Sequence, residues 1–393
     1  MSTLEARQQN KTHRARPRPP FEQIALVLQG GGALGAYQAG VYEALAEADL
    51  HPDWVAGISI GAVNTALIVG NPPQTRVDKL KEFWESVTTP FWQGAERNPD
   101  QLLANADVVR SYLNQVSAAF ALTSGAPAFF TPRLSVPWLA PAGTPSATSY
   151  YDTAPLRQTL ERLVDFDRIN AGKTRFSVGS VNVRTGNFVY FDTTTHTIRP
   201  EHVLASGALP PGFPAVEIEG EYYWDGGLVS NTPLQWVMDA DPRRDTLAFQ
   251  VDLWDARGDV PRTMAQVMTR QKEIVYSSRT RANSDRVRQV QQMRNTLALL
   301  LEKLPDELRT GPEFEILKSA SIRKVYNLVH LIYRPQQYEG DSKDYEFSRA
   351  SMHTHWRAGY NDTVRTLRHP EVLERPQNPE GFLTFDLSRD GRE

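Results

Sequence analysis

Residues 54–69 read WVAGISIGAVNTALIV, and this stretch decides the fold. Residues 54–57 have the apolar and small side chains of a buried strand, and residues 62–69 continue as a helix. Between them, Gly57-Ile58-Ser59-Ile60-Gly61 follows the pattern G-x-S-x-G. In a strand–turn–helix context this pattern is typical of a nucleophile elbow, a sharp turn that exposes the serine hydroxyl. Ser59 is therefore the candidate nucleophile, and the flanking glycines relieve crowding at the turn.

A second glycine-rich turn lies one βαβ unit upstream. Residues 24–28 (IALVL) form a continuous apolar run, typical of a strand buried on both faces, and residues 37–48 read as a helix. Between them stands Gly30-Gly31-Gly32-Ala33-Leu34-Gly35. Bare backbone N–H groups at a helix start suit either a pyrophosphate or a developing oxyanion. Parallel strands with right-handed crossovers would bring this loop and Ser59 to the same edge of the sheet.

A third segment supplies a candidate base. Asp225-Gly226-Gly227 follows a strand-like stretch, residues 215–224. Taken alone, Asp-Gly is a good hairpin turn, so this motif carries weight only together with the other two. Further strands are predicted at 176–183, 187–191, 247–253 and 325–333.

Together these segments resemble the patatin-like phospholipase family. That family is marked by a strand, a G-G-G-x-[KR]-G loop, a G-x-S-x-G elbow and a D-G-[GA] segment in this order, and the likeness covers residues 21–253 or so. Residues 205–214, with Asn231 and Pro233, match further family segments. The resemblance implies a three-layer α/β/α fold with a mainly parallel sheet, here followed by a C-terminal helical extension. One departure is Leu34, where the family carries Lys or Arg.

The resemblance also assigns roles to residues. It implies a serine lipid acyl hydrolase in which Ser59 is the nucleophile and Asp225 the base, with no histidine between them and no cofactor or metal. The oxyanion would rest on the loop residues Gly30, Gly31, Gly32 and Ala33. The glycines that support the motifs would be Gly35, Gly57, Gly61, Gly226 and Gly227.

The resemblance and the composition divide the chain into three regions. We expect a disordered basic tail over residues 1–20 and a catalytic domain over 21–255. Within that domain, residues 88–150 or so are rich in proline and large apolar side chains and read as a cap-like insertion, or as an ordinary helical subdomain. A mainly helical extension would occupy 256–393.

Several alternatives stay open. The same chemistry would serve a hydrolase of intracellular short-chain polyesters or hydroxyacid oligomers. A serine acyltransferase would normally carry histidine where this chain has Ile58. A dinucleotide-binding oxidoreductase would need an acidic residue at the end of the second strand, whereas Asp49 and Asp53 precede or begin it. The remaining alternatives are a non-enzymatic lipid carrier, a triad completed by His330, His353 or His355, and a metal pair formed by His353 and His355.

Composition bounds the partners and the location. The 393 residues contain no cysteine, which excludes disulfides, thiolate catalysis and cysteine-bound metals. A net charge of −3 gives no drive toward nucleic acid. No apolar run reaches the roughly 20 residues of a membrane span, and the N-terminus lacks a secretory core. We expect a cytoplasmic enzyme acting on a lipid or acyl ester. Residues 262–304 form a basic amphipathic pattern that offers peripheral membrane contact.

Overall fold

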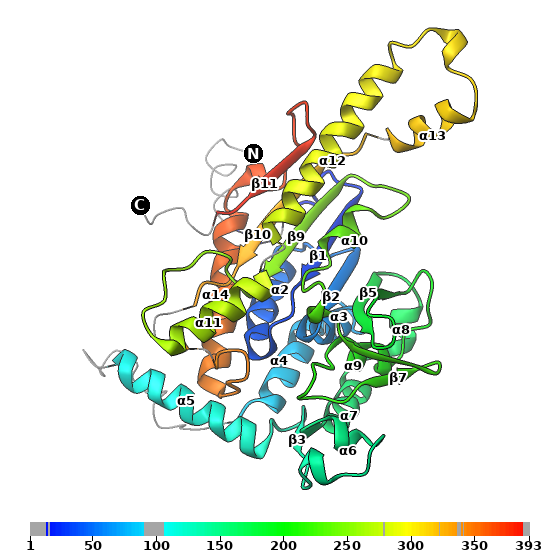
Figure 1. Ribbon diagram of the computed structural model, residues 1–393. Helices are drawn as coiled ribbons and strands as arrows, with labels where there is room; N and C mark the ends of the chain where they lie inside the picture. Colours follow the sequence, from blue (N-terminus) through cyan, green and yellow to red (C-terminus); the bar gives the residue numbers. More distant parts are fainter. Residues whose placement is uncertain are drawn as a thin grey trace.

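The computed structural model describes residues 13–14, 16–89, 106–277, 280–321, 323–335, 339–340 and 342–387. Within this part of the chain, nine strands form one mixed sheet in the order β11-β10-β9-β1-β2-β5-β8-β7, with β6 also paired to β5 (Figure 1). Its strands are β1 (Gln23–Leu28), β2 (Trp54–Ile58), β5 (Arg175–Asn182), β6 (Phe188–Asp192), β7 (Val216–Ile218), β8 (Glu221–Asp225), β9 (Thr246–Asp252), β10 (Tyr326–Ile332) and β11 (Phe382–Phe385).

Nine α-helices precede residue 240 among the described residues. They are α2 (Ala36–Glu47), α3 (Ile60–Val69), α4 (Arg76–Val87), α5 (Ala106–Ser124), α6 (Pro145–Thr148), α7 (Ala154–Leu163), α8 (Phe166–Asn170), α9 (Pro200–Ser206) and α10 (Leu234–Met238). A short ribbon of β3 (Thr131–Pro132) and β4 (Tyr151–Asp152) lies apart from the main sheet. The C-terminal helices are α11 (Met264–Ser277), α12 (Thr280–Leu301), α13 (Pro312–Ala320) and α14 (Arg349–Leu367).

The strand β1 shows why the sheet is covered on both sides. Ile24, Leu26 and Leu28 point into a core shared with α2, α3, α4 and α14, while Ala25 and Val27 point into a core shared with α10 and part of α12. Successive strand residues face opposite sides, so an uninterrupted apolar run needs a helix layer on each side. The sequence prediction of a three-layer α/β/α fold with a mainly parallel sheet is confirmed.

Parallel pairing brings the two glycine-rich turns together, as predicted. β1 pairs with β2 and with β9, and β2 pairs with β5, all in parallel. Leu28 lies opposite Gly57, so the glycine loop after β1 and the Ser59 turn after β2 leave the sheet at the same edge.

The expected strand at 215–224 is wrong as a single element. Residues 216–218 and 221–225 form the antiparallel hairpin β7–β8, because Glu219 (φ 54°) and Gly220 (φ 83°) adopt the left-handed conformation of a tight turn. β8 runs antiparallel to β5 and pairs Asp225 with Ser180, one residue beyond the pair Ile58–Gly179. Asp225 therefore ends its strand at the level where Ser59 begins its turn.

The C-terminal region contributes to the sheet as well as to the helices. β10 and β11 extend the sheet in parallel beyond β9, and α14 packs along α2. In Figure 1 the far end of α12 and α13 project away from the sheet. The single amphipathic stretch expected over 262–304 is two helices, α11 and α12, and residues 278–279 between them lie outside the described residues. Among the described residues no helix has the length and apolar character needed to cross a membrane.

The N-terminal tail and the insertion over residues 88–150 differ in part from the sequence predictions. Most of the tail expected over 1–20 lies outside the described residues, but His13 bonds to Glu47 and the Arg16 N–H donates to the Ala48 carbonyl, so this part packs on the end of α2 rather than being disordered. In the insertion expected over 88–150, Phe129 and Phe130 are buried against Phe213 and Phe347, which is ordinary core packing. Phe91 and Trp92, also singled out there, lie outside the described residues.

The α2–α14 contact depends on two glycines. A Cβ on Gly40 would lie 1.9 Å from the Trp356 carbonyl oxygen, and one on Gly359 would lie 2.0 Å from that of Tyr37. We expect Gly40→Ala to destabilise the protein by roughly 1–3 kcal/mol through overpacking, against the gain of about 1 kcal/mol that alanine brings to an open helix. Urea unfolding measures the change. Gly340→Ala, where the added methyl meets open space, is the control; equal stability of both variants would contradict the close packing.

Candidate active site

The backbone at Ser59 is held in a conformation that non-glycine residues seldom adopt. Its φ is 56° and its ψ −123°, at the junction between β2 and α3. The glycines on either side have no room for a side chain, since a Cβ on Gly57 would lie 2.2 Å from the Gly61 carbonyl oxygen and one on Gly61 2.4 Å from that of Leu28. The predicted supporting roles of Gly57 and Gly61 thus correspond to two close backbone contacts.

Asp225 faces this turn from the end of β8. The Ser59 Oγ donates a hydrogen bond to Asp225 Oδ2 at 2.6 Å, and the Gly227 N–H donates to Oδ1 at 2.7 Å. Asp225 is only 2% exposed, and a Cβ on Gly226 would lie 2.5 Å from the Gly179 carbonyl oxygen. Burial raises the pKa of Asp225 to about 7, although the hydrogen bonds from Ser59 and Gly227 act in the opposite direction.

Ser206, at the end of α9, fixes the backbone of the serine turn through two hydrogen bonds. Its hydroxyl accepts a hydrogen bond from the Ser59 N–H at 3.1 Å and donates one to the Gly179 carbonyl at 2.6 Å. This single side chain therefore joins the nucleophile turn to β5, the strand on which Asp225 is paired. The sequence placed Ser206 in a segment bordering the site but did not reveal this contact.

The glycine loop lies beside the serine turn. An added Cβ on Gly30 would lie 3.0 Å from the Ser59 Cβ, so the two turns are in contact. Of the four N–H groups predicted to hold an oxyanion, two are already engaged: Gly30 donates to the Asn231 carbonyl and Ala33 to the Asp344 carbonyl. The N–H groups of Gly31 and Gly32 have no acceptor among the described residues, which narrows the candidate oxyanion donors to these two.

The shape of the loop also explains its composition. Gly32 has a φ of 56°, and a Cβ there would lie 2.0 Å from the Asp344 carbonyl oxygen. A Cβ on Gly35 would meet Ile60 and Trp84. Leu34, at the position where the family has a cation, is fully buried in the core. The loop consequently offers backbone N–H groups but no side-chain charge.

A buried polar network fixes the loop to its neighbours. The Gln29 side chain accepts from the N–H groups of Leu253 and Trp254 and donates to Thr232. Asn231 Nδ2 and Trp254 Nε1 both donate to the Gly30 carbonyl, at 2.9 and 3.0 Å. Such fully bonded buried groups fix one backbone arrangement. Asn231 was predicted from the family pattern, whereas the contacts of Gln29 and Trp254 join segments more than 200 residues apart and leave no local signature.

The histidines considered for a triad lie elsewhere. His330 is on β10 beside Asp252, and His355 is on α14 beside Glu339. In the described part of the chain, no histidine bonds to Ser59 or Asp225, and no three metal-ligating side chains gather in one place. The Asp225 carboxylate bonds directly to the Ser59 hydroxyl, without a histidine between them.

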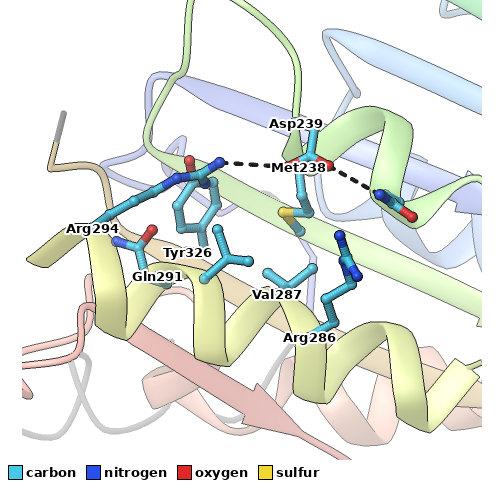
Figure 2. A pocket seen from close by; sticks show the side chains of 9 residues that line it. Met238, Asp239, Arg286, Val287, Gln291, Arg294 and Tyr326 are labelled. Carbon is cyan, nitrogen blue, oxygen red and sulfur yellow. Dashed lines mark hydrogen bonds and ion pairs between the residues drawn. The ribbon is translucent and has the colours of Figure 1, made fainter. Parts of the chain in front are cut away.

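A cavity of about 250 Å³ lies between α10, α12 and β10 (Figure 2). Met238, Val287 and Tyr326 form its apolar part, and Arg294 reaches across it to Asp239. None of its lining residues belongs to the glycine loop, the Ser59 turn or the Asp225 segment. The cavity is thus separate from the serine site.

The site combines a strained serine turn, a buried aspartate bonded to it and a glycine loop beside both. These features place this protein among the α/β proteins that carry a serine–carboxylate pair at a sheet edge. The family model described as patatin-like phospholipase matches residues 26–237, more than half of the chain, and a second model described as patatin phospholipase matches residues 274–379. The chain belongs to the patatin-like phospholipase family.

Curated relatives match over a short segment. The chain is 44% identical over 68 residues to the mouse protein "patatin-like phospholipase domain-containing protein 7" and 39% identical over 69 residues to the Drosophila melanogaster protein "neuropathy target esterase sws". These segments cover 17% and 18% of this chain and 5% of each relative. A solved structure of VipD from Legionella pneumophila aligns with 94% of this chain and 72% of its own, at 15% identity and a TM-score of 0.38.

Replacing Ser206 tests how the serine turn is held. Ser206→Ala would leave the Ser59 N–H and the Gly179 carbonyl without their partner in a buried site, and we expect a loss of roughly 1–3 kcal/mol in unfolding free energy. Chemical denaturation measures it. Ser319→Ala, which removes an exposed hydroxyl bonded only within α13, is the matched control. Wild-type stability of Ser206→Ala would show that the hydroxyl is not needed there.

Proposed function

We propose that this protein is a serine lipid acyl hydrolase, of phospholipase A, lysophospholipase or esterase type, that works through a Ser59–Asp225 dyad and an acyl-serine intermediate. The observation that carries the proposal is the 2.6 Å hydrogen bond from Ser59 Oγ to a buried carboxylate, next to a glycine loop with two N–H groups that no described residue accepts. Family membership supports ester hydrolysis as the reaction class.

In the first half-reaction, Ser59 Oγ attacks the ester carbonyl carbon while its proton passes to Asp225. An ordinary aspartate is a weak base toward an alcohol, and the raised pKa of Asp225 brings it closer to the strength that proton transfer at neutral pH requires. The tetrahedral oxyanion rests on the N–H groups of Gly31 and Gly32. Each such donor is worth roughly 3–4 kcal/mol in the transition state. Collapse expels the alcohol, which takes the proton from Asp225.

In the second half-reaction, water attacks the acyl-Ser59 carbonyl and gives its proton to Asp225. A second oxyanion forms in the same cradle. When it collapses, the free acid leaves and the proton returns to Ser59 Oγ, so that the enzyme is regenerated. One carboxylate thus acts as base and acid in both steps, and no histidine, metal or cofactor is required by this scheme.

We further propose a cytoplasmic enzyme whose substrate is presented at a membrane surface. The stretch 262–294 contains eight Arg and Lys residues against Glu273 and Asp285, and exposed apolar side chains on α11 accompany them. Such a helix binds the interface of an anionic bilayer. We also propose that residues 21–255 form the catalytic domain and that residues 256–393 form a C-terminal extension.

Two substitutions test the dyad. We expect Ser59→Ala and Asp225→Asn each to lower kcat on p-nitrophenyl acyl esters by at least about a thousandfold, as when a nucleophile or its base is removed. An organophosphonate should label wild-type Ser59 and fail to label Ser59→Ala. Circular dichroism confirms that the variants fold. Near-wild-type turnover of Asp225→Asn, with loss in His355→Ala, would replace the dyad by a histidine mechanism.

The pH profile tests the state of Asp225. The base must be a carboxylate, and burial raises its pKa to about 7. We therefore expect kcat/KM to fall with decreasing pH through about 7, and to fall about tenfold per unit well below it, because that is how the carboxylate fraction declines. Initial rates between pH 5 and 9, with stability measured in parallel, provide the profile. Full activity at pH 5 in a folded protein would exclude a buried, neutral-pH base.

A further inference from the structure

The inner face of α11 is attached to the glycine loop through several polar contacts. Lys272 Nζ lies 2.9 Å from Asp344 Oδ1, and the Asp344 carbonyl receives the Ala33 N–H at 2.8 Å. Next to Lys272, Glu273 Oε1 pairs with Lys343 Nζ at 2.7 Å, and the Glu273 side chain is only 12% exposed. The helix thus holds the segment 343–344, which in turn holds the loop from outside.

Tyr276, one turn further along α11, adds a second line of contact. Its ring stacks on Trp254, whose indole N–H donates to the Gly30 carbonyl. Its own backbone carbonyl accepts from the side chains of Gln29 and Asn231, both of which bond the loop or its flank. Both ends of the glycine loop therefore contact α11 or segments that α11 holds, and this helix lies outside residues 26–237, which the first family model matches.

The outer face of α11 has the opposite character. Five large apolar side chains of this helix are exposed: Met264, Val267, Met268, Ile274 and Val275. At 100° per residue they cover one side, and Lys272, Glu273 and Tyr276 cover the other. Arg262 precedes the stripe and is exposed. Among the described residues of 262–294, the exposed charged side chains are Arg262, Arg286 and Arg288 against Asp285, and this basic excess fits an anionic lipid surface better than a zwitterionic one.

From these two faces we infer that α11 couples membrane contact to the oxyanion loop: Lys272 is a positioning residue for the Gly31 and Gly32 N–H groups, and an anionic lipid surface, by covering the outer stripe, raises kcat. This inference rests on the proposed hydrolase function. A 14-residue helix is marginal in water on its own, so burial of its apolar side stabilises it. Any surface that binds only the seated helix shifts the population toward it, and with it toward the ordered loop.

The positioning role is tested with a soluble ester and no lipid. For Lys272→Met we expect kcat on p-nitrophenyl butyrate to fall roughly tenfold, less than the full loss of an oxyanion donor, with KM and the melting temperature near wild type. Lys272→Arg, which keeps the charge beside Asp344, should restore most of kcat. Asp344→Asn should resemble Lys272→Met, and the double variant should be no worse than either. Wild-type kcat in Lys272→Met would overturn the positioning role.

The coupling is tested by adding vesicles that cannot be hydrolysed. Ether-linked phosphatidylglycerol vesicles should raise kcat of the wild-type protein on the soluble ester several-fold, and ether-linked phosphatidylcholine vesicles should raise it much less. Met264→Ser combined with Met268→Ser should bring the ratio of rates with and without vesicles close to one. The matched control is Ile316→Ser on α13, which removes a side chain of similar exposure (66%, against 74% for Met264) and should leave the ratio unchanged.

The possible failures are distinguishable. Absence of turnover and of phosphonate labelling in the wild-type protein would defeat the proposed hydrolase function. Turnover that is unaffected by anionic vesicles, or raised equally in the Met264→Ser/Met268→Ser variant, would defeat the coupling and leave the dyad standing.

Discussion

The hydrogen bond between Ser59 Oγ and Asp225 Oδ2 is the contact on which the rest of the site depends. It forms only because β2 and β8, which reach β5 from opposite directions, end at neighbouring residues of that strand. A parallel strand carries the serine outward to a tight turn, and an antiparallel strand carries the carboxylate inward. A shift of either strand by one residue would turn one of the two side chains to the other face of the sheet.

Close backbone contact is the reason for so many glycines at this edge. Around Ser59 the added Cβ of Gly30, Gly57, Gly61 or Gly226 would lie within 3.0 Å of a neighbouring atom. Side chains would push apart the serine turn, the glycine loop and the Asp225 segment. Their absence keeps the serine and the free N–H groups near one another and also removes water from Asp225. The same packing therefore sets the geometry and raises the pKa of the carboxylate.

The parts predicted from sequence are those with a local signal. The run 24–28, the G-x-S-x-G turn and the alternation of strand and helix are periodic or motif-like, and the structure has those elements to within two residues. The hairpin at Glu219–Gly220 was missed because its turn lacks Asn-Gly and because the alternation of apolar and acidic residues typical of a strand runs on through it. The contacts of Ser206 and Asp344 could not be found, since they cross 147 and more than 300 residues, and that of Asp344 uses only its backbone carbonyl.

The C-terminal region is better understood as part of the site than as an appendage. Two of its strands complete the sheet, and α14 packs on the helix that follows the glycine loop. Its segment 343–344, together with α11, occupies the outer side of that loop and takes one of the N–H groups that the motif alone would assign to the oxyanion. A motif specifies which atoms can bind the oxyanion, but the packing of distant segments decides which of them remain available to do so.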